Sequence, residues 1–414
     1  MSPRRLAEAR YRRSMNWVWL CCFSMPKPQP NEPTRGNRVD VILVTILVLQ
    51  IAGLVYAGLA PFSFSPPNRV QHISEGDALQ FDAAGIATSE GVLESATHFP
   101  DDKLTIHLII EPDGEPGAGL GTILSLEDDQ RVSPLVVAQW KTWVVIRVRE
   151  PDRATRGYWE MDAAGFPAGE THFVTITSGP THGTAMYVDG VATGDARTRS
   201  VIRNDRALDA RLLVGCLGNG SAGWRGKLKG LAILGERLDA SAVAAHHERV
   251  TKGDVAALQD VSGLIALYDF TDLEPDRPEL LHSAANLVRG SALGKLEVPK
   301  VFSPLRPETF GIPQLRDMKA DWFLQDLLRN IAGFIPLGFV LGLMLIRRRD
   351  APGFVVAFQV AILGVLLSLT IESIQIALPM RSSSLSDLTL NVIGTMIGSV
   401  IALAFRHTRI AGPN

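Results

Sequence analysis

The sequence predicts a membrane α-helical module of four transmembrane helices combined with an all-β sandwich domain. Four apolar runs along the 414-residue chain are each long enough to cross about 30 Å of hydrocarbon. The long stretch between the first and second runs shows short β-rich segments in place of helical periodicity. Basic residues gather in alternate segments between the runs, which is the pattern of a multi-pass membrane protein.

The apolar runs set the boundaries of the expected segments. The predicted transmembrane helices cover 40–61, 324–346, 354–378 and 387–405. The other segments are a basic cytoplasmic segment at 1–39, an exported β-sandwich at 62–300, a Pro-rich linker with an interfacial helix at 301–323, a cytoplasmic loop at 347–353, an outer turn at 379–386 and a cytoplasmic tail at 406–414. The first run is longer than the apolar core of a signal peptide, and Pro61 follows Ala60, so we expect a retained anchor.

Positive charge predicts the orientation of the helices, because Lys and Arg near span ends mark the cytoplasmic side. Such residues precede the first span, join the second to the third at 347–349, and follow the fourth at Arg406 and Arg409. Both termini are therefore expected in the cytoplasm, and residues 62–322 outside the cytoplasmic (inner) membrane of a bacterium. Segment 62–322 holds 26 basic and 36 acidic residues, which argues against nucleic acid as a partner. The lipid bilayer itself is an expected partner.

The exported segment has the pattern of an all-β domain. Its clearest β-rich runs are separated by Gly, Pro and Asp, and they cover 103–110, 121–126, 134–140, 142–149, 172–177, 184–193, 211–216 and 227–234. Asp189-Gly190 predicts a hairpin turn, and 236–250 predicts a helix. Many short strands at this spacing predict a β-sandwich. Cys216 is the single cysteine of this segment, so we expect no disulfide framework in it.

Several of these runs resemble a known family in their order. They are LQFD at 79–82, HFVTIT at 172–177, MYVDGV at 186–191 and GWRGKLKGLAIL at 223–234, followed by a helix that begins LDAS. This order resembles the concanavalin-A-like (laminin-G-like) lectin/glucanase domain. The resemblance implies a jelly-roll sandwich in which a late strand returns beside the early ones. Such domains commonly bind glycans or proteins, and one branch of the superfamily hydrolyses glycans.

The residues argue against glycan hydrolysis in this domain. Retaining sandwich glycosidases need two carboxylates about 5 Å apart, which that superfamily arranges as Glu-x-Asp-x-x-Glu along one strand. Glu160 and Asp162 are present here, but Gly165 stands at the last position, and MDAAG at 161–165 predicts a turn. We therefore predict no catalytic residue in the sandwich.

Aromatic, histidine and acidic residues are the remaining candidates for ligand contacts in the exported segment. Four tryptophans either stack on sugars or fill the core: Trp140, Trp143, Trp159 and Trp224. The adjacent His246 and His247 are expected to face solvent. We find no metal-ligand spacing, and an acidic run at 127–129 is the one stretch that suggests Ca²⁺. The sequence predicts no cofactor.

Polar residues recur at corresponding places in the last three predicted helices. DLLRNIAG at 326–333 and DLTLNVIG at 387–394 both open an apolar run with Asp-Leu-x-x-Asn. With the predicted orientation, the polar residues that meet at the depth of the outer leaflet are Asp326, Arg329, Asn330, Glu372, Gln375, Arg381, Asp387 and Asn391. Charged groups at such depths usually pair or line a wet cavity. We name these eight residues the polar cluster and predict that they bind a ligand.

The helix starts suggest how the polar cluster would act. Each Asp is expected to cap its helix, and each Asn to lie one turn deeper. Both helices run inward, so both positive dipole ends point to the same depth. Arg329 and Arg381 would add positive charge, and a headgroup carrying phosphate suits such a site. The structural alternative is a polar knot that merely holds the helices together.

The spacing of these residues resembles a second family. The motifs are Asp326-x3-Asn330-x3-Phe334-x-Pro336-x-Gly338, Glu372-x2-Gln375, Arg381, and Asp387-x3-Asn391-x2-Gly394-x3-Gly398. They are similar to those of the VanZ-like family, whose members are linked to resistance to glycopeptide antibiotics such as teicoplanin. The resemblance covers the four spans, whereas the simplest members have a short loop in place of the exported domain.

Together these features predict a bacterial envelope protein with a lectin-like outer domain and a VanZ-like membrane module. It would bind or organise an envelope glycan or a lipid-linked precursor. Two alternatives stay open. One is an enzyme that acts on a lipid headgroup, with Glu372 or Asp387 as acid or base. The other is a structural anchor that displays the outer domain.

Overall fold

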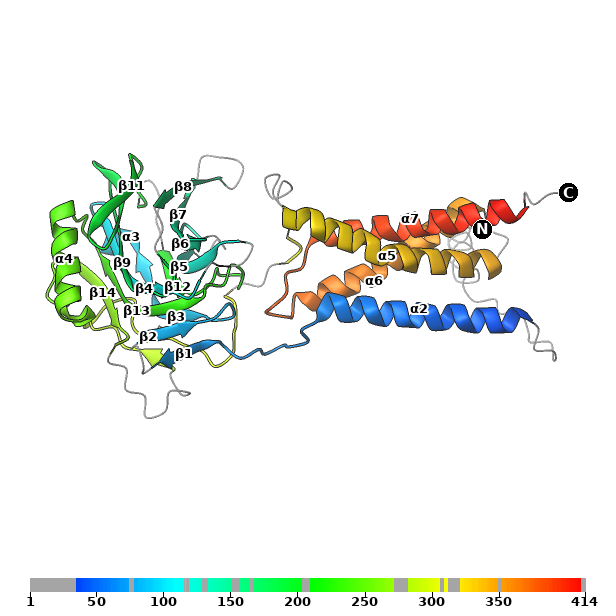
Figure 1. The fold of residues 1–414 in the computed structure, drawn as a ribbon, viewed down its shortest axis with the longest axis horizontal. Helices are drawn as coiled ribbons and strands as arrows, with labels where there is room; N and C mark the ends of the chain where they lie inside the picture. Colours follow the sequence, from blue (N-terminus) through cyan, green and yellow to red (C-terminus); the bar gives the residue numbers. More distant parts are fainter. Residues whose placement is uncertain are drawn as a thin grey trace, which may run out of the picture. The chain divides into compact units, whose positions relative to one another are not determined.

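The computed structural model contains a β-sandwich and a set of long apolar helices (Figure 1). The residues that it describes are 35–73, 78–114, 116, 119–128, 133–150, 157–163, 167–202, 209–271, 282–305, 309–311, 321–348 and 352–410. Both parts of the predicted fold class are confirmed.

The first sheet of the sandwich has eight antiparallel strands within the described residues. Seven of them follow the order β1 (Val70–Ile73), β2 (Ala78–Phe81), β13 (Gly226–Leu234), β4 (Leu104–Pro112), β9 (His172–Gly179), β10 (Gly183–Val188) and β11 (Val191–Arg197). The eighth, β14 (Leu264–Asp269), pairs with the second half of β13. The late strand β13 therefore lies between the early strands β2 and β4, as the resemblance implied.

The second sheet also has eight antiparallel strands in the described part of the chain. Their order is β15 (Ser283–Ala284), β16 (Leu296–Glu297), β3 (Ala87–Glu94), β12 (Asp209–Val214), β5 (Gly121–Asp128), β6 (Leu135–Trp140), β7 (Trp143–Glu150) and β8 (Gly157–Ala163). The turn predicted at 161–165 is wrong for its first three residues, which belong to β8. They pair with β7, and this ladder of hydrogen bonds outweighs the local turn preference. Gly165 lies outside the described residues.

The core of the sandwich lies between the inner faces of the two sheets. Large side chains from both sheets and from the loop before β13 are fully buried there, among them Phe81, Ile106, Leu124 and Trp224. The indole Nε1 of Trp224 donates to Oε1 of Gln139 at 2.9 Å, so its polar atom is satisfied. Trp224 is therefore a core residue, one of the two roles the sequence allowed for it.

The central strands β4 and β9 are buried on both faces because a helix covers the first sheet from outside (Figure 1). This helix, α4 (Ala240–Lys252), is capped by Asp239, whose carboxylate accepts from the backbone N–H of Ala242 at 2.8 Å. A 3₁₀ turn, η1 (Val255–Leu258), follows it, and a short helix α3 (Ser95–His98) follows β3. His246 lies on the buried face of α4, so the expectation that it faces solvent is wrong.

The hairpin between β10 and β11 turns at Asp189 and Gly190, as predicted. Both residues have positive φ, 52° and 78°, which is the left-handed conformation that a tight two-residue hairpin requires. The Asp189 carboxylate also accepts from the backbone N–H of Phe173 at 2.8 Å. Asp is tolerated in this conformation because its side chain forms such local hydrogen bonds.

Four helices in the described part of the chain are long and apolar enough to span a membrane. They are α2 (Arg35–Leu59), α5 (Asp321–Arg348), α6 (Gly353–Gln375) and α7 (Leu385–Ile410). The protein is therefore a multi-pass membrane protein.

Glycines bring the backbones of α5 and α7 into direct contact. A Cβ atom on Gly394 would overlap the carbonyl oxygen of Ile331, and one on Gly398 would overlap that of Ile335. Gly338 on α5 likewise lies against the backbone of Thr395. Membrane helices associate mainly through such close packing, since lipid supplies no hydrophobic drive between them. The Gly-x-x-x-Gly spacing thus fixes the relative depth of α5 and α7.

Candidate ligand-binding site on the membrane helices

The two Asp-Leu-x-x-Asn motifs occupy different positions in their helices. α7 begins at Leu385, so Asp387 lies in its first turn, where a negative charge is favourable. α5 begins at Asp321, so Asp326 lies in the second turn and does not cap the helix. The capping role predicted for Asp326 is wrong because helix α5 starts before the apolar run and enters it without a break. The same prediction for Asp387 is wrong because Asp387 is the third residue of α7.

Three carboxyl groups from three helices come together. The side chain of Asp387 is hydrogen-bonded to that of Asp326, and Glu372 lies close enough for electrostatic repulsion with both. Asp326 and Asp387 are half-buried, and Glu372 is buried. We name Asp326, Glu372 and Asp387 the carboxyl triad. Acidic side chains in a membrane helix bundle are costly, so packing alone does not favour this arrangement.

Glu372 also holds the turn that joins α6 to α7. Its Oε2 accepts from the backbone N–H of Ser384 at 2.7 Å. The same turn pairs with Gly311, whose N–H donates to the carbonyl of Ser383 at 2.8 Å and whose carbonyl accepts from Leu385 at 3.0 Å. Glu372 therefore fixes the start of α7 and, with it, the position of Asp387.

Gln375 and Arg381 are directed at the end of α2. Gln375 Nε2 donates to the carbonyl of Gly58 at 2.8 Å, and the Arg381 guanidinium donates to the carbonyls of Ala57 (3.3 Å) and Ala60. The last carbonyls of a helix lack intrahelical partners, and an arginine is well suited to satisfy them. Arg381 thus has a structural task that its predicted role as a supplier of positive charge did not include.

Asn391 lies at the contact between α6 and α7. It is buried, and its Nδ2 donates to Ser368 Oγ at 3.0 Å. Asn330 on α5 is half-buried, whereas Arg329 is exposed. Within the described residues, Arg329 forms no ion pair with the carboxyl triad. The structure thus brings the carboxyl triad together and leaves Arg329 apart from it.

Several members of the polar cluster have buried polar atoms without a hydrogen-bond partner in the described part of the chain. These atoms are Nδ2 of Asn330, Oε1 of Gln375, Nε of Arg381 and Oδ1 of Asn391. Buried polar groups in folded proteins are nearly always paired, so each of these atoms needs a partner, which a water molecule or a bound ligand can supply. The polar cluster is therefore incomplete as a set of protein–protein contacts.

Sequence reasoning missed the residues that support the cluster. Ser384 and Ser386, which precede Asp387, share a hydrogen bond of 2.5 Å, and Ser368 binds the Asn391 amide. The run Ser382–Ser384 before an Asp was a usable signal, because serine favours helix starts. The sequence held no comparable signal for the contacts with the end of α2, because their acceptors are backbone carbonyls, which every residue type carries.

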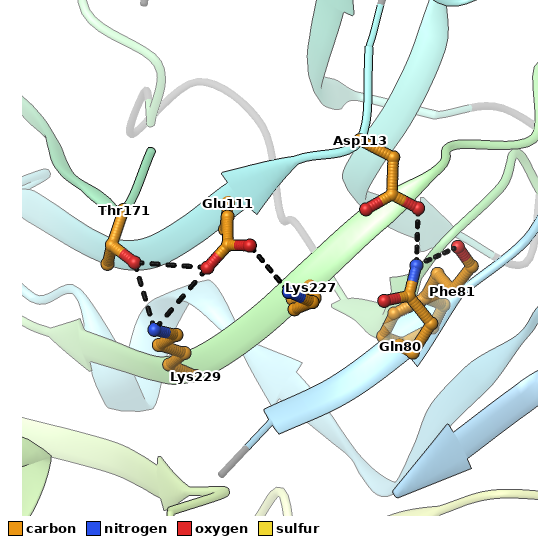
Figure 2. A network of polar contacts seen from close by, with 7 residues as sticks. All are labelled: Gln80, Phe81, Glu111, Asp113, Thr171, Lys227 and Lys229. Atoms are coloured by element: carbon orange, nitrogen blue, oxygen red, sulfur yellow. Dashed lines mark hydrogen bonds and ion pairs between the residues drawn. The ribbon is translucent and has the colours of Figure 1, made fainter. Parts of the chain in front are cut away.

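A second polar network lies on the first sheet of the sandwich, on the face opposite the core. Figure 2 shows Glu111 between Lys227 and Lys229, with carboxylate–ammonium distances of 2.5 and 3.5 Å, and Gln80 bonded to Asp113 at 2.5 Å. Burial would raise the pKa of Glu111, but the hydrogen bond from Lys227 and the charges of both lysines lower it overall. The carboxylate of Glu111 is therefore paired with two lysines, whereas the carboxyl triad has no basic partner of this kind among the described residues.

Metal binding finds no support in the described residues. No group of three or more His, Cys, Asp or Glu side chains there has the arrangement of a metal site. In the acidic run that suggested Ca²⁺, Glu127 is buried and its Oε1 accepts from Ser133 Oγ, Ser125 Oγ and Gly218 N at 2.5 to 3.0 Å. Asp129 lies outside the described residues.

Comparisons with solved structures give only distant similarities. A protein from Bacteroides ovatus ATCC 8483 that has been proposed to bind carbohydrate is 14% identical over 55% of this chain and 60% of its own, with a TM-score of 0.37. The binding domain of botulinum neurotoxin serotype G is 10% identical over 44% of this chain and 45% of its own (TM-score 0.35). A sialidase from Trypanosoma rangeli is 15% identical over 41% and 27% (TM-score 0.31). The chain thus spans less than two thirds of each.

No curated protein matches the chain. The comparison with protein families, in contrast, finds a match in the helical part. The VanZ/LLP1 family model matches residues 280–406, a segment that contains α5, α6 and all but the last residues of α7. All eight residues of the polar cluster lie in that segment. The helical part that carries the polar cluster is therefore similar to the VanZ/LLP1 family, as its motifs indicated.

Proposed function

We propose that this protein binds an envelope component, a glycan or a lipid-linked glycan, at the polar cluster of its membrane helices. The observation that carries the proposal is the set of buried polar atoms without partners on Asn330, Gln375, Arg381 and Asn391. A purely structural knot would pair these atoms with one another, because an unpaired buried donor or acceptor costs about 1–3 kcal/mol.

The chemistry of the cluster favours the sugar part of such a ligand over its phosphate. The hydrogen bond between Asp326 and Asp387 requires a proton on one of the two carboxyl groups. Carboxyl groups and amides then both donate and accept hydrogen bonds, so together they suit hydroxyl groups. The carboxyl triad offers a phosphate no positively charged partner. Arg381 already donates to the carbonyls at the end of α2. These contacts argue against the phosphate-carrying headgroup that the helix dipoles and arginines suggested.

The proposal includes the predicted orientation, with the sandwich outside the cytoplasmic membrane of a bacterium. Arg347 and Arg348 in the last turn of α5 support it, because positive residues mark the cytoplasmic side. The cluster lies near the opposite ends of these helices: Asp326 is in the second turn of α5, and Asp387 in the first turn of α7. A link to glycopeptide resistance is part of this proposal only through the family similarity.

Native mass spectrometry of the full chain, extracted from membranes in mild detergent, tests this function. We expect a bound glycolipid on the wild-type protein and its loss in Asp326→Asn and Asp387→Asn. Ser373→Ala is the matched control, because Ser373 lies beside Glu372 in sequence but is exposed and bonds only to Leu369 of its own helix. Equal occupancy in all four proteins would contradict the proposal.

An enzyme acting on a lipid headgroup is the second candidate, and the carboxyl triad is the observation that favours it. Two nearby carboxyl groups in different environments can divide the roles of acid and base. In that case Glu372→Gln should retain the bound lipid and accumulate it unconverted. A structural anchor, the third candidate, would show no glycolipid whose retention depends on Asp326 or Asp387.

A further inference from the structure

Two tryptophan side chains stand exposed at the tip of the β6–β7 hairpin. Trp140 is 47% exposed and Trp143 is 38% exposed. They are directly opposite each other in the register of the two strands, so both side chains lie on the same face of the second sheet. Large aromatic side chains are normally buried, and a pair of them left in solvent marks a candidate contact surface.

The hairpin tip is held rigidly by the core of the sandwich. Gln139 is 2% exposed, and its Nε2 donates to the carbonyls of Lys141 and Gly114, each at 2.7 Å. Its Oε1 accepts from the fully buried Trp224 at 2.9 Å. The turn that presents the two indoles is therefore pinned from inside, which lowers the entropy cost of binding a ligand.

The surroundings of the indoles are polar, and the Lys141 ammonium lies over one face of the Trp140 ring, 5.1 Å from its centroid. Strand alternation places Val145 and Arg147 on the same face as Trp143, with Asp162 opposite Val145 and Glu160 opposite Arg147. Arg147 and Glu160 form an ion pair at 2.7 Å, and Asp162 is exposed. At about 3.3 Å per residue, the ion pair lies roughly 13 Å from Trp143, a distance that a few sugar rings would cover.

We propose that Trp140 and Trp143 form a stacking platform for a saccharide, with Asp162 and the Arg147–Glu160 pair as partners for its hydroxyl groups. A sugar ring has an apolar C–H face that packs on an indole, and its rim of hydroxyls needs donors and acceptors nearby. A lipid surface fits less well, because Asp162 and Glu160 would have to approach anionic headgroups. This site lies on a different domain from the polar cluster and does not depend on the function proposed there.

The test uses the full chain in detergent and isothermal titration with two neutral probes, the β-1,4-linked tetramers of glucose and of N-acetylglucosamine. We expect the wild-type protein to bind at least one of them. Trp140→Ala and Trp143→Ala should each weaken binding about tenfold or more, and Trp143→Phe should retain most of it. Val191→Ala, an exposed residue at another hairpin, is the control and should bind like the wild type.

Three results would overturn the site. They are no binding of either probe, unchanged binding of the probes in one alanine variant, and unchanged binding in both variants together with lost binding to phosphatidylglycerol vesicles, which would assign the tryptophans to a lipid surface. Because both tryptophans are exposed, the variants should keep the wild-type melting temperature, which is to be measured alongside. Asp326→Asn should leave saccharide binding at this platform unchanged, so failure here and failure of the membrane site are distinguishable.

Discussion

Acid should destabilise the sandwich through one buried histidine. His107 on β4 is fully buried beneath α4, with Nδ1 2.8 Å from Thr175 Oγ1 and Nε2 3.1 Å from Nδ1 of His246. Burial, reinforced by the neighbouring His246, lowers the pKa of His107 to about 3. Burial and the charge of Arg249 also lower the pKa of His246. The folded domain therefore keeps His107 neutral.

The size of the effect follows from the difference between the folded and unfolded pKa. An unfolded histidine titrates near 6.5, so the unfolded state takes up a proton that the folded state refuses. The contribution of His107 is fully present above pH 6.5 and is lost as the pH falls toward 3. Between pH 7 and pH 5 the free energy of unfolding should fall by about 2 kcal/mol from this residue alone.

Urea unfolding at several pH values, followed by tryptophan emission, measures this loss in the detergent-solubilised protein. His107→Gln should be less stable than the wild type at pH 7, because it disturbs a packed contact, but should lose much less stability between pH 7 and pH 5. His182→Gln, at an exposed position, should follow the wild type. A His107→Gln protein with the wild-type pH dependence would refute the assignment to His107.

Three further predictions concern the membrane module. Gly398→Leu should force α7 away from Ile335 and lower stability by roughly 1–3 kcal/mol or more in a thermal melt, whereas Gly333→Leu, whose nearest neighbour is a side-chain atom 3.6 Å away, should be tolerated. Arg381→Ala should melt earlier than the wild type, because the last carbonyls of α2 lose a donor worth about 1–3 kcal/mol. Reporter fusions at positions 200 and 383 should signal from outside the cytoplasm and those at 350 and 410 from inside. A cytoplasmic signal at 200 would contradict the orientation.

Local sequence patterns predicted the membrane-spanning helices and the hairpin turn, and both predictions are confirmed. Apolar runs long enough for a membrane identify helices because every backbone polar group must be satisfied internally in lipid. The Asp189-Gly190 pair identifies its hairpin because few other residues tolerate positive φ. Local patterns gave the wrong structure at two places. At β8 the pairing with β7 replaced the predicted turn, and at the start of α5 the helix begins before the residue that was predicted to cap it.

The candidate site was only partly readable in the sequence, for a related reason. The repeated Asp and Asn spacing located Asp326 and Asp387 at corresponding depths, the predicted orientation placed Glu372 beside them, and the structure brings these three together. The partner of Arg381 is a backbone carbonyl 321 positions earlier in the chain, and any residue could have supplied it. His246 was misplaced because its burial depends on how α4 packs on the sheet, which the helix sequence does not specify.

A high-resolution structure of the full chain in native lipid particles tests the central claim most directly. The claim is that the unpaired buried atoms of the polar cluster bind an envelope component. The predicted result is density for a polar, hydroxyl-bearing molecule within hydrogen-bonding distance of Oε1 of Gln375, Oδ1 of Asn391 or the carboxyl triad. A site in which these side chains satisfy one another, with no molecule bound, would contradict the account and identify the polar cluster as a structural knot.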